Sequence, residues 1–168
     1  MSDRWLQIMC VWVLVLIGSP SLAAPPEKSD ASRRLYDRVM EEYRHRDYQA
    51  ALAGFHFFLE LHGTSGLAPS ARYWLGECQY RLGRYDDAMT TFLNLVSYYP
   101  LNPKMAATTL KIAMTYRKLG QPEEARITFE RVVEEWPDSM EADVARKELA
   151  KYATEAVELT GGEAVTLQ

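Results

Sequence analysis

The stretch Tyr73–Pro100, YWLGECQYRLGRYDDAMTTFLNLVSYYP, decides how the rest of the chain is interpreted. Apolar residues recur at helical spacing as far as Leu82, and a second apolar stripe runs from Tyr85 to Val96. Gly83 lies between the two segments, and glycine tolerates the left-handed conformation in which helices often end. The stretch therefore predicts two helices joined by a tight turn.

The same pattern recurs along the chain at a spacing of 37 residues, the separation of Phe92 and Phe129. The matching positions are Ala51, Ala88 and Ala125, then Phe55, Phe92 and Phe129, then Pro100 and Pro137. Because alanine lets two helices approach and the phenylalanine ring fills the remaining gap, we predict that these residues form the core. The order Leu-Gly, Ala-x3-Phe, Pro is that of the tetratricopeptide repeat, whose ordinary period is about 34 residues.

We therefore predict an all-α tetratricopeptide helix-turn-helix solenoid with three repeats and a C-terminal capping helix. The predicted boundaries are 33–69, 70–103 and 104–139 for the repeats, 139–159 for the capping helix and 160–168 for a tail. Asn102 and Ser139 are predicted helix N-caps. The first repeat is the least regular, since Arg46 stands where the others have glycine.

Residues 1–23 have the features of a secretory signal peptide. Arg4 precedes the apolar run Leu6–Ile17, and small residues ending at Ala23 offer a cleavage site. We expect cleavage there, followed by a flexible lead-in over 24–32 and no stable membrane span in the processed chain. An uncleaved N-terminal anchor is the alternative.

Composition and motifs point away from several classes of function. The formal net charge of −4 gives no reason to expect nucleic-acid binding. The sequence has no HExxH motif, no glycine-rich phosphate loop and no G-x-S-x-G motif. His56 and Glu60 are one helical turn apart, but two ligands rarely suffice for zinc. We predict a non-enzymatic protein without catalytic residues, cofactor or metal.

Two residues of the central stretch allow more than one interpretation. Cys78 has the polar counterparts Glu41 and Thr115, which predicts a partly exposed helix face. It is either a small packing residue or the source of an intermolecular disulfide. Trp74 has polar counterparts as well, so it either packs between repeats or lies on the surface.

A further stripe suggests a binding surface. In the first helix of each pair, residues at i, i+4, i+7 and i+8 share a face. They are Tyr36, Met40, Tyr43 and Arg44; then Tyr73, Glu77, Tyr80 and Arg81; then Leu110, Met114, Arg117 and Lys118. The tetratricopeptide pattern implies that this face lines a concave groove, where tyrosines offer flat contacts with a polar tip.

We hypothesise that this groove binds an extended or helical protein segment carrying acidic and apolar residues. Arg44, Arg81 and Lys118 would supply a basic line in an otherwise acidic protein. In the alternative, the tyrosines only pack against neighbouring helices, and the basic residues are solvated.

Four segments carry a closer family resemblance: YWLGE at Tyr73–Glu77, GRYDDA at Gly83–Ala88, Tyr99-Pro100, and WPDS at Trp136–Ser139. They resemble the C-terminal tetratricopeptide domain of the YbgF family, also called CpoB, of the Tol-Pal system. The resemblance covers roughly 31–152. It implies a periplasmic, non-catalytic adaptor in cell-envelope maintenance and division, with Tol components or a peptidoglycan synthase as partners.

Two features qualify this resemblance. The family usually carries an N-terminal coiled coil that trimerises, whereas only Ala24–Ser32 lies between the expected signal peptide and the first repeat, so the oligomeric state stays open. Related solenoids, including the BamD outer-membrane assembly lipoproteins, share much of the pattern. An accessory role in outer-membrane protein assembly or export is therefore the alternative function.

Overall fold

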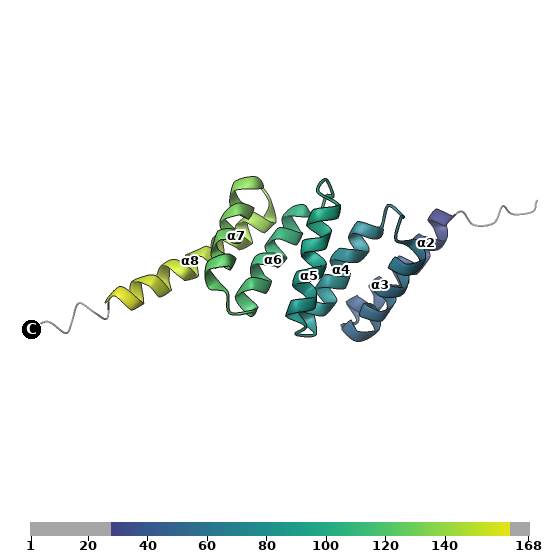
Figure 1. Cartoon of the computed structure of the whole chain (residues 1–168), viewed down its shortest axis with the longest axis horizontal. Coiled ribbons are helices and arrows are strands. Elements are labelled where there is room, and N and C mark those ends of the chain that lie inside the picture. Colours follow the sequence, from purple (N-terminus) through teal and green to yellow (C-terminus); the bar gives the residue numbers. More distant parts are fainter. Residues whose placement is uncertain (1–27, 162–168) are drawn as a thin grey trace, which may run out of the picture.

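The computed structural model describes residues 28–161, and every regular element within that range is a helix (Figure 1). The predicted signal peptide, residues 24–27 of the lead-in and residues 162–168 of the tail lie outside the described residues. The helices are α2 (Lys28–Arg44), α3 (Tyr48–His62), α4 (Ala68–Arg81), α5 (Tyr85–Tyr98), α6 (Met105–Lys118), α7 (Pro122–Glu135) and α8 (Met140–Gly161).

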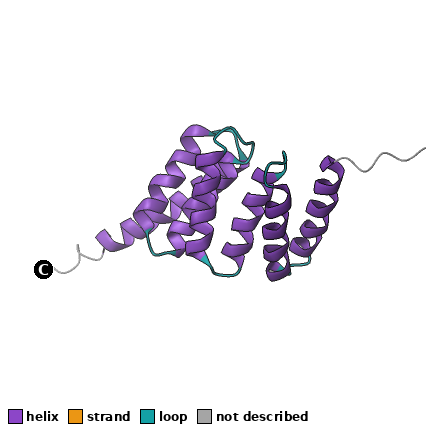
Figure 2. Ribbon diagram, turned by 45° about the vertical axis from the view of Figure 1, so that its right-hand side comes forward, coloured by secondary structure: helices purple, strands orange, loops and turns teal. Residues whose placement is uncertain are grey.

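The helices form three antiparallel pairs followed by a capping helix, which confirms the predicted solenoid (Figure 2). The pairs are α2 with α3, α4 with α5, and α6 with α7, and each pair packs on the next. α8 packs against both α7 and α6, and α4 also contacts α6 directly. These last contacts place the first helices of the pairs side by side along one face, which we call the inner face.

The predicted core is confirmed. The three repeated phenylalanines are fully buried, and so is the alanine four residues before each of them. They are Phe55, Phe92 and Phe129, with Ala51, Ala88 and Ala125. A spacing of four residues puts the alanine and the phenylalanine on one face of the second helix. This face packs against the first helix of the same pair. Each ring belongs to its own apolar cluster, and the three clusters follow one another along the solenoid.

The turns within the pairs share one backbone conformation. Gly83 and Gly120 have φ of 75° and 74°, and Arg46, at the equivalent position of the first pair, has φ of 63°. A side chain in this left-handed region costs about 1–2 kcal/mol relative to glycine. The first turn therefore carries strain that the other two avoid.

We expect Gly83→Ala and Gly120→Ala each to lower the free energy of unfolding by about 1 kcal/mol, because only the backbone penalty applies. A Cβ at either glycine would meet nothing within 4 Å. Arg46→Gly should raise the free energy of unfolding by up to about 1 kcal/mol. The gain is limited because glycine also has more conformational freedom in the unfolded chain. Urea titration measures these changes. Gly66→Ala, also in open space but without a positive φ, is the control and should be neutral.

The structure corrects two predicted boundaries. Residues 28–32 belong to α2 rather than to a flexible lead-in, and Ser32 is buried. Asn102 is not the N-cap of α6, which begins three residues later at Met105. Its Oδ1 instead accepts a hydrogen bond of 2.7 Å from the backbone N–H of Lys104, within the connecting turn.

Ser139 is an N-cap as predicted, since its Oγ accepts a 3.1 Å hydrogen bond from the N–H of Ala142 at the start of α8. Between residues 28 and 161, no helix is both long and apolar enough to cross a bilayer.

Candidate functional site

The twelve residues of the predicted stripe lie on α2, α4 and α6, and they differ in accessibility. The exposed residues are Arg44, Arg81 and Lys118, and the half-buried ones are Tyr36, Met40, Tyr43, Tyr80, Met114 and Arg117. Tyr73, Glu77 and Leu110 are buried. The nine accessible residues make up what we call the inner-face surface.

The three buried residues do not offer the accessible surface expected of them. The ring of Tyr73 lies 6.1 Å from that of Phe92 and 5.2 Å from that of Trp74, measured between centroids. Leu110 belongs to the apolar cluster around Phe129. Residues spaced by four and seven span a wide arc of a helix, so the margin with Tyr73 and Leu110 faces the second helix of the pair instead of solvent. Glu77 is instead paired with side chains of the neighbouring first helices.

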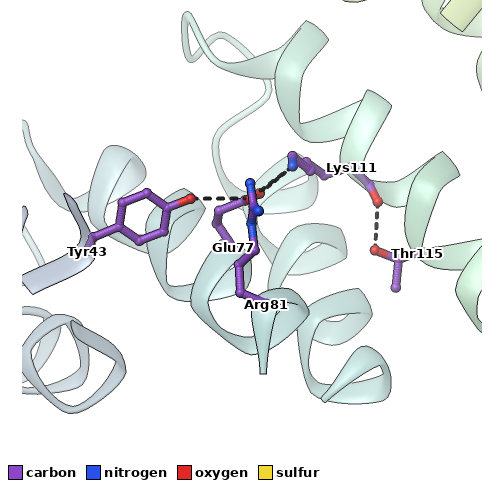
Figure 3. A network of polar contacts seen from close by, with 5 residues as sticks. All are labelled: Tyr43, Glu77, Arg81, Lys111 and Thr115. Carbon is purple, nitrogen blue, oxygen red and sulfur yellow. Dashed lines mark hydrogen bonds and ion pairs between the residues drawn. The ribbon is translucent and has the colours of Figure 1, made fainter. Parts of the chain in front are cut away.

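Glu77 forms the polar centre of the inner face and joins all three pairs (Figure 3). Its Oε1 accepts a 3.0 Å hydrogen bond from Nε of Arg81, one turn along α4. The Nζ of Lys111, on α6, lies 2.9 Å from Oε1 and 2.7 Å from Oε2. The hydroxyl of Tyr43, on α2, lies 3.4 Å from Oε1. A buried carboxylate is stable only with such partners, so the inner face is built around this ion pair.

Sequence reasoning missed Lys111. It is the counterpart of Trp74 in the next repeat and falls outside the stripe by one position. The sequence does show that Lys111 follows Glu77 by 34 residues and that Glu77 follows Tyr43 by the same number. This equal spacing could have indicated Lys111. These separations differ from the repeat period, because the contacts run diagonally across neighbouring first helices.

Aromatic rings surround this polar centre. Tyr43 packs on Tyr48 and Trp74, with ring centroids 5.4 Å and 4.7 Å away, and Tyr80 packs on Tyr85 at 5.3 Å. Trp74 thus packs between repeats, the first of the two alternatives for this residue. Tyr48 and Tyr85 open the second helices of their pairs and were not among the predicted surface residues.

The cations of the centre also contact these rings. Nζ of Lys111 lies 5.4 Å from the ring centroid of Tyr80, and the guanidinium of Arg81 lies 5.9 Å from that of Tyr48. At this range the quadrupole of the ring attracts a cation. The charges and rings therefore hold one another in place, and the surface is preorganised.

Burial raises the pKa of Tyr43 to about 12, and the negative charge of Glu77 acts in the same direction. Burial likewise raises the pKa of Tyr80. Both hydroxyls are therefore protonated at neutral pH, and that of Tyr43 donates its hydrogen bond to Glu77. The hydrogen bond to Glu77 raises the pKa of Arg81, which stays a permanent cation.

The basic line expected from the sequence is partly neutralised by carboxylates of the same chain. Arg81 of this line pairs with Glu77. Arg117, next to Lys118 but not part of the line, pairs with Glu148 of α8 and joins the third pair to the cap. Arg44 pairs with Glu41 on the surface of α2. Exposed pairs of this kind are weak, so Arg44 remains open to a competing partner.

Cys78 is fully buried, which corrects the expected partly exposed position. Its side of α4 faces the preceding pair and packs in the cluster around Phe55 and Phe58. The equivalent residue of α2, Glu41, is exposed, and α2 belongs to the first pair of the described residues. Thr115 is buried as well, with its hydroxyl donating a 2.6 Å hydrogen bond to the carbonyl oxygen of Lys111.

We expect the thiol of Cys78 to be unreactive in the native protein. Burial raises its pKa to about 12, and Glu77 adds to this shift, so almost no thiolate forms near pH 8. In a Cys10→Ser chain, Ellman's reagent should label Cys78 only after addition of guanidinium chloride. Rapid native labelling, or a disulfide-linked dimer on a non-reducing gel, would contradict this prediction.

In the described part of the chain, no group of three or more His, Cys, Asp or Glu side chains could hold a metal ion. The inner face instead combines rings, donors and one buried ion pair on a rigid scaffold. Such an arrangement suits the binding of a protein segment, because aromatic side chains give large contacts at low entropic cost.

Comparison with known proteins agrees with this architecture. Two tetratricopeptide repeat family models match, one at residues 36–104 and one at residues 108–139, together more than half of the chain. No curated protein matches the sequence.

Several solved structures share the fold. The first tetratricopeptide domain of Spaghetti (RPAP3), bound to the HSP90 peptide SRMEEVD, is 19% identical, with a TM-score of 0.63 over 77% of this chain and 96% of that chain. The Yersinia enterocolitica type III secretion chaperone SycD, in complex with a peptide of the translocator YopD, is 18% identical, with a TM-score of 0.62 over 79% and 95%. The second such domain of human RPAP3, in complex with the HSP70 peptide SGPTIEEVD, is 17% identical, with a TM-score of 0.59 over 76% and 97%.

At these identities the structures agree in fold alone, and the assignment rests on the family matches together with the three helix pairs and their repeated core. The chain belongs to the tetratricopeptide repeat family.

Proposed function

We propose that this protein is a non-catalytic interaction scaffold that binds an extended or helical segment of a partner protein on its inner-face surface. We place it in the periplasm, in cell-envelope maintenance and division, with a Tol component or a peptidoglycan synthase as partner. The observation that carries the proposal is the preorganised centre of the inner face, where Glu77 ties Tyr43, Arg81 and Lys111 together from three helix pairs.

Two further lines support the proposal. Tetratricopeptide domains are binding modules, and the RPAP3 and SycD structures contain bound peptides. The envelope role is supported by the signal-peptide features of residues 1–23 and by the YbgF-like segments around Tyr73–Glu77.

Site-specific photo-crosslinking tests the proposal. Tyr80 is half-buried and adjoins the polar centre, so a photoreactive residue there should capture a partner in living cells. Ile127, on α7, is exposed away from the inner face and serves as the matched control position. Arg44→Glu together with Arg81→Glu should abolish capture at Tyr80, because both substitutions reverse charge beside the bound segment.

Each outcome has a distinct meaning. Capture of a Tol component or a peptidoglycan synthase at Tyr80 supports both the surface and the envelope role. Capture of outer-membrane assembly proteins supports the surface but moves the role to protein assembly or export. Capture at Ile127 with none at Tyr80 would show that the partner binds the outer helices.

A further inference from the structure

Two carboxylates, one on α4 and one on α8, are each shared by two cations. In both cases one of the two cations comes from α6, which packs against both of these helices. The carboxylates are Glu77, paired with Arg81 and Lys111 (Figure 3), and Glu148, paired with Arg117 and Lys151. We call these four cations, which cross from α4 over α6 to α8, the cation row.

In all four of these ion pairs the cation is the more exposed member. The side chain of Glu77 is 3% accessible and that of its partner Arg81 is 48% accessible. For Glu148 and Lys151 the values are 13% and 61%. The other five ion pairs between described residues have the opposite order, since each carboxylate is more exposed than its cation. The cation row therefore presents positive charge to solvent in a chain whose net charge is −4.

Tyr80 adjoins cations from both halves of the row. Nζ of Lys111 lies 5.4 Å from the centroid of its ring. Burial raises the pKa of Tyr80, and the positive charge of Arg117 acts in the opposite direction, so this guanidinium lies near the hydroxyl. Among the residues that the structure describes, none forms a hydrogen bond with the hydroxyl of Tyr80. A hydrogen-bond donor and two cations thus converge at one half-buried position.

We propose that the partner segment is acidic and that one of its Asp or Glu side chains binds at Tyr80, between the two halves of the cation row. The inference rests on the proposed function, because it names the chemistry of the segment that the inner-face surface binds. The bound carboxylate would accept a hydrogen bond from the hydroxyl of Tyr80, close to the charges of Lys111 and Arg117. Each internal carboxylate is shared by two cations, so the row attracts further negative charge without giving up its own pairs.

This site differs from the basic line that the sequence suggested. Arg44 pairs with Glu41, which is slightly more exposed than the arginine, so that end of the line presents both signs of charge. Lys118 is exposed beside Arg117 and adds to the positive surface. Asp86 and Asp87, in the first turn of α5, pair with none of the four cations of the row. The positive surface therefore lies over α4, α6 and α8 instead of following all three repeats.

Fluorescence anisotropy of a labelled octaglutamate peptide tests the inference on the full chain. Both ends of the peptide are blocked, so that only side chains carry carboxylates. We expect saturable binding that weakens as the salt concentration rises, and no binding of blocked octaglutamine. Arg81→Gln combined with Lys151→Gln should weaken binding about tenfold, because two exposed cations are lost. Tyr80→Phe, which removes only the hydroxyl, should weaken it about threefold.

Arg131→Gln combined with Arg146→Gln is the matched control. Arg131 is 48% accessible, as is Arg81, and both belong to i,i+4 pairs. Arg146 and Lys151 both belong to i,i+3 pairs on α8. The control therefore removes the same net charge from pairs of the same spacing, and binding should change less than about twofold.

Both double variants should stay folded, which circular dichroism checks. In the cation-row variant, Glu77 keeps Lys111 and Glu148 keeps Arg117, so neither carboxylate is left without a cation. The control variant changes only exposed pairs.

Three results of the titration would overturn the inference. Equal weakening in the two double variants would assign binding to net charge alone. Failure of octaglutamate to bind, or equal binding of octaglutamine, would show that the site does not select acidic side chains. Octaglutamine with a free C-terminal carboxylate that bound as tightly as blocked octaglutamate would assign the site to chain ends instead of side chains.

The proposed function and this inference fail separately. Capture at Tyr80 in cells of a segment that lacks Asp and Glu would overturn the inference and leave the proposed function standing. Capture at Ile127 with none at Tyr80 would overturn the proposed binding surface, whatever the peptide titration shows.

Discussion

Phe92→Ala should lower the free energy of unfolding by about 3–5 kcal/mol, the range for removing a buried phenylalanine ring. The ring is fully buried between α4 and α5, in the middle pair of the solenoid. It lies against Gly76, where a Cβ would be only 2.6 Å from Cε1 of the ring. Glycine cannot extend a side chain into the space that the ring leaves, so the cavity stays open. The loss of unfolding free energy should therefore lie near the upper end of this range.

The position of Phe92 adds a second effect. Each repeat is stabilised mainly by its neighbours, so loss of the central core uncouples the first pair from the third. We expect the single unfolding transition in urea to broaden, with a lower m-value. Leu93→Ala, next in sequence but exposed, is the control and should change the stability by less than about 0.5 kcal/mol. A comparable loss from both variants would refute the assigned core.

Glu77→Ala should lower the free energy of unfolding by about 2–3 kcal/mol. Removing one partner of a buried ion pair costs about 3–5 kcal/mol when the other charge stays buried. Here the cost is smaller because Arg81 is exposed and only Lys111 is mostly buried, with 17% of its side chain accessible. Lys111 would also lose the contact that ties α6 to α4.

Replacing both partners at once separates the charge effect from packing. Glu77→Leu combined with Lys111→Met replaces the pair by apolar side chains and should recover most of the stability lost by Glu77→Ala. Glu41→Ala, which breaks the exposed pair with Arg44, should cost less than about 1 kcal/mol. If Glu77→Ala and Glu41→Ala had equal effects in thermal unfolding, Glu77 would not be the centre of the inner face.

The inner-face surface was only partly predictable. Periodicity placed all twelve residues on the first helices of the pairs, and nine of them are accessible. It could not separate Tyr80, which reaches the surface, from Tyr73, which packs on Phe92. The two occupy neighbouring parts of one helical arc, and only the second helix of the pair decides where the boundary falls.

The sequence by itself determined the helix pairs, their turns and their core. Those features depend on residues close in the chain: Ala-x3-Phe on one helical face, and glycine where the backbone needs a positive φ. Local spacing carries this information because a helix repeats every 3.6 residues whatever surrounds it.

Only the tertiary structure decided which side chains meet across repeats. Glu77 contacts partners 34 residues away on either side, and Cys78 is buried against Phe55 and Phe58 of the preceding pair. Contacts between pairs depend on how the helices are rotated and offset against one another, and packing sets those two quantities, whereas the period of any one helix does not.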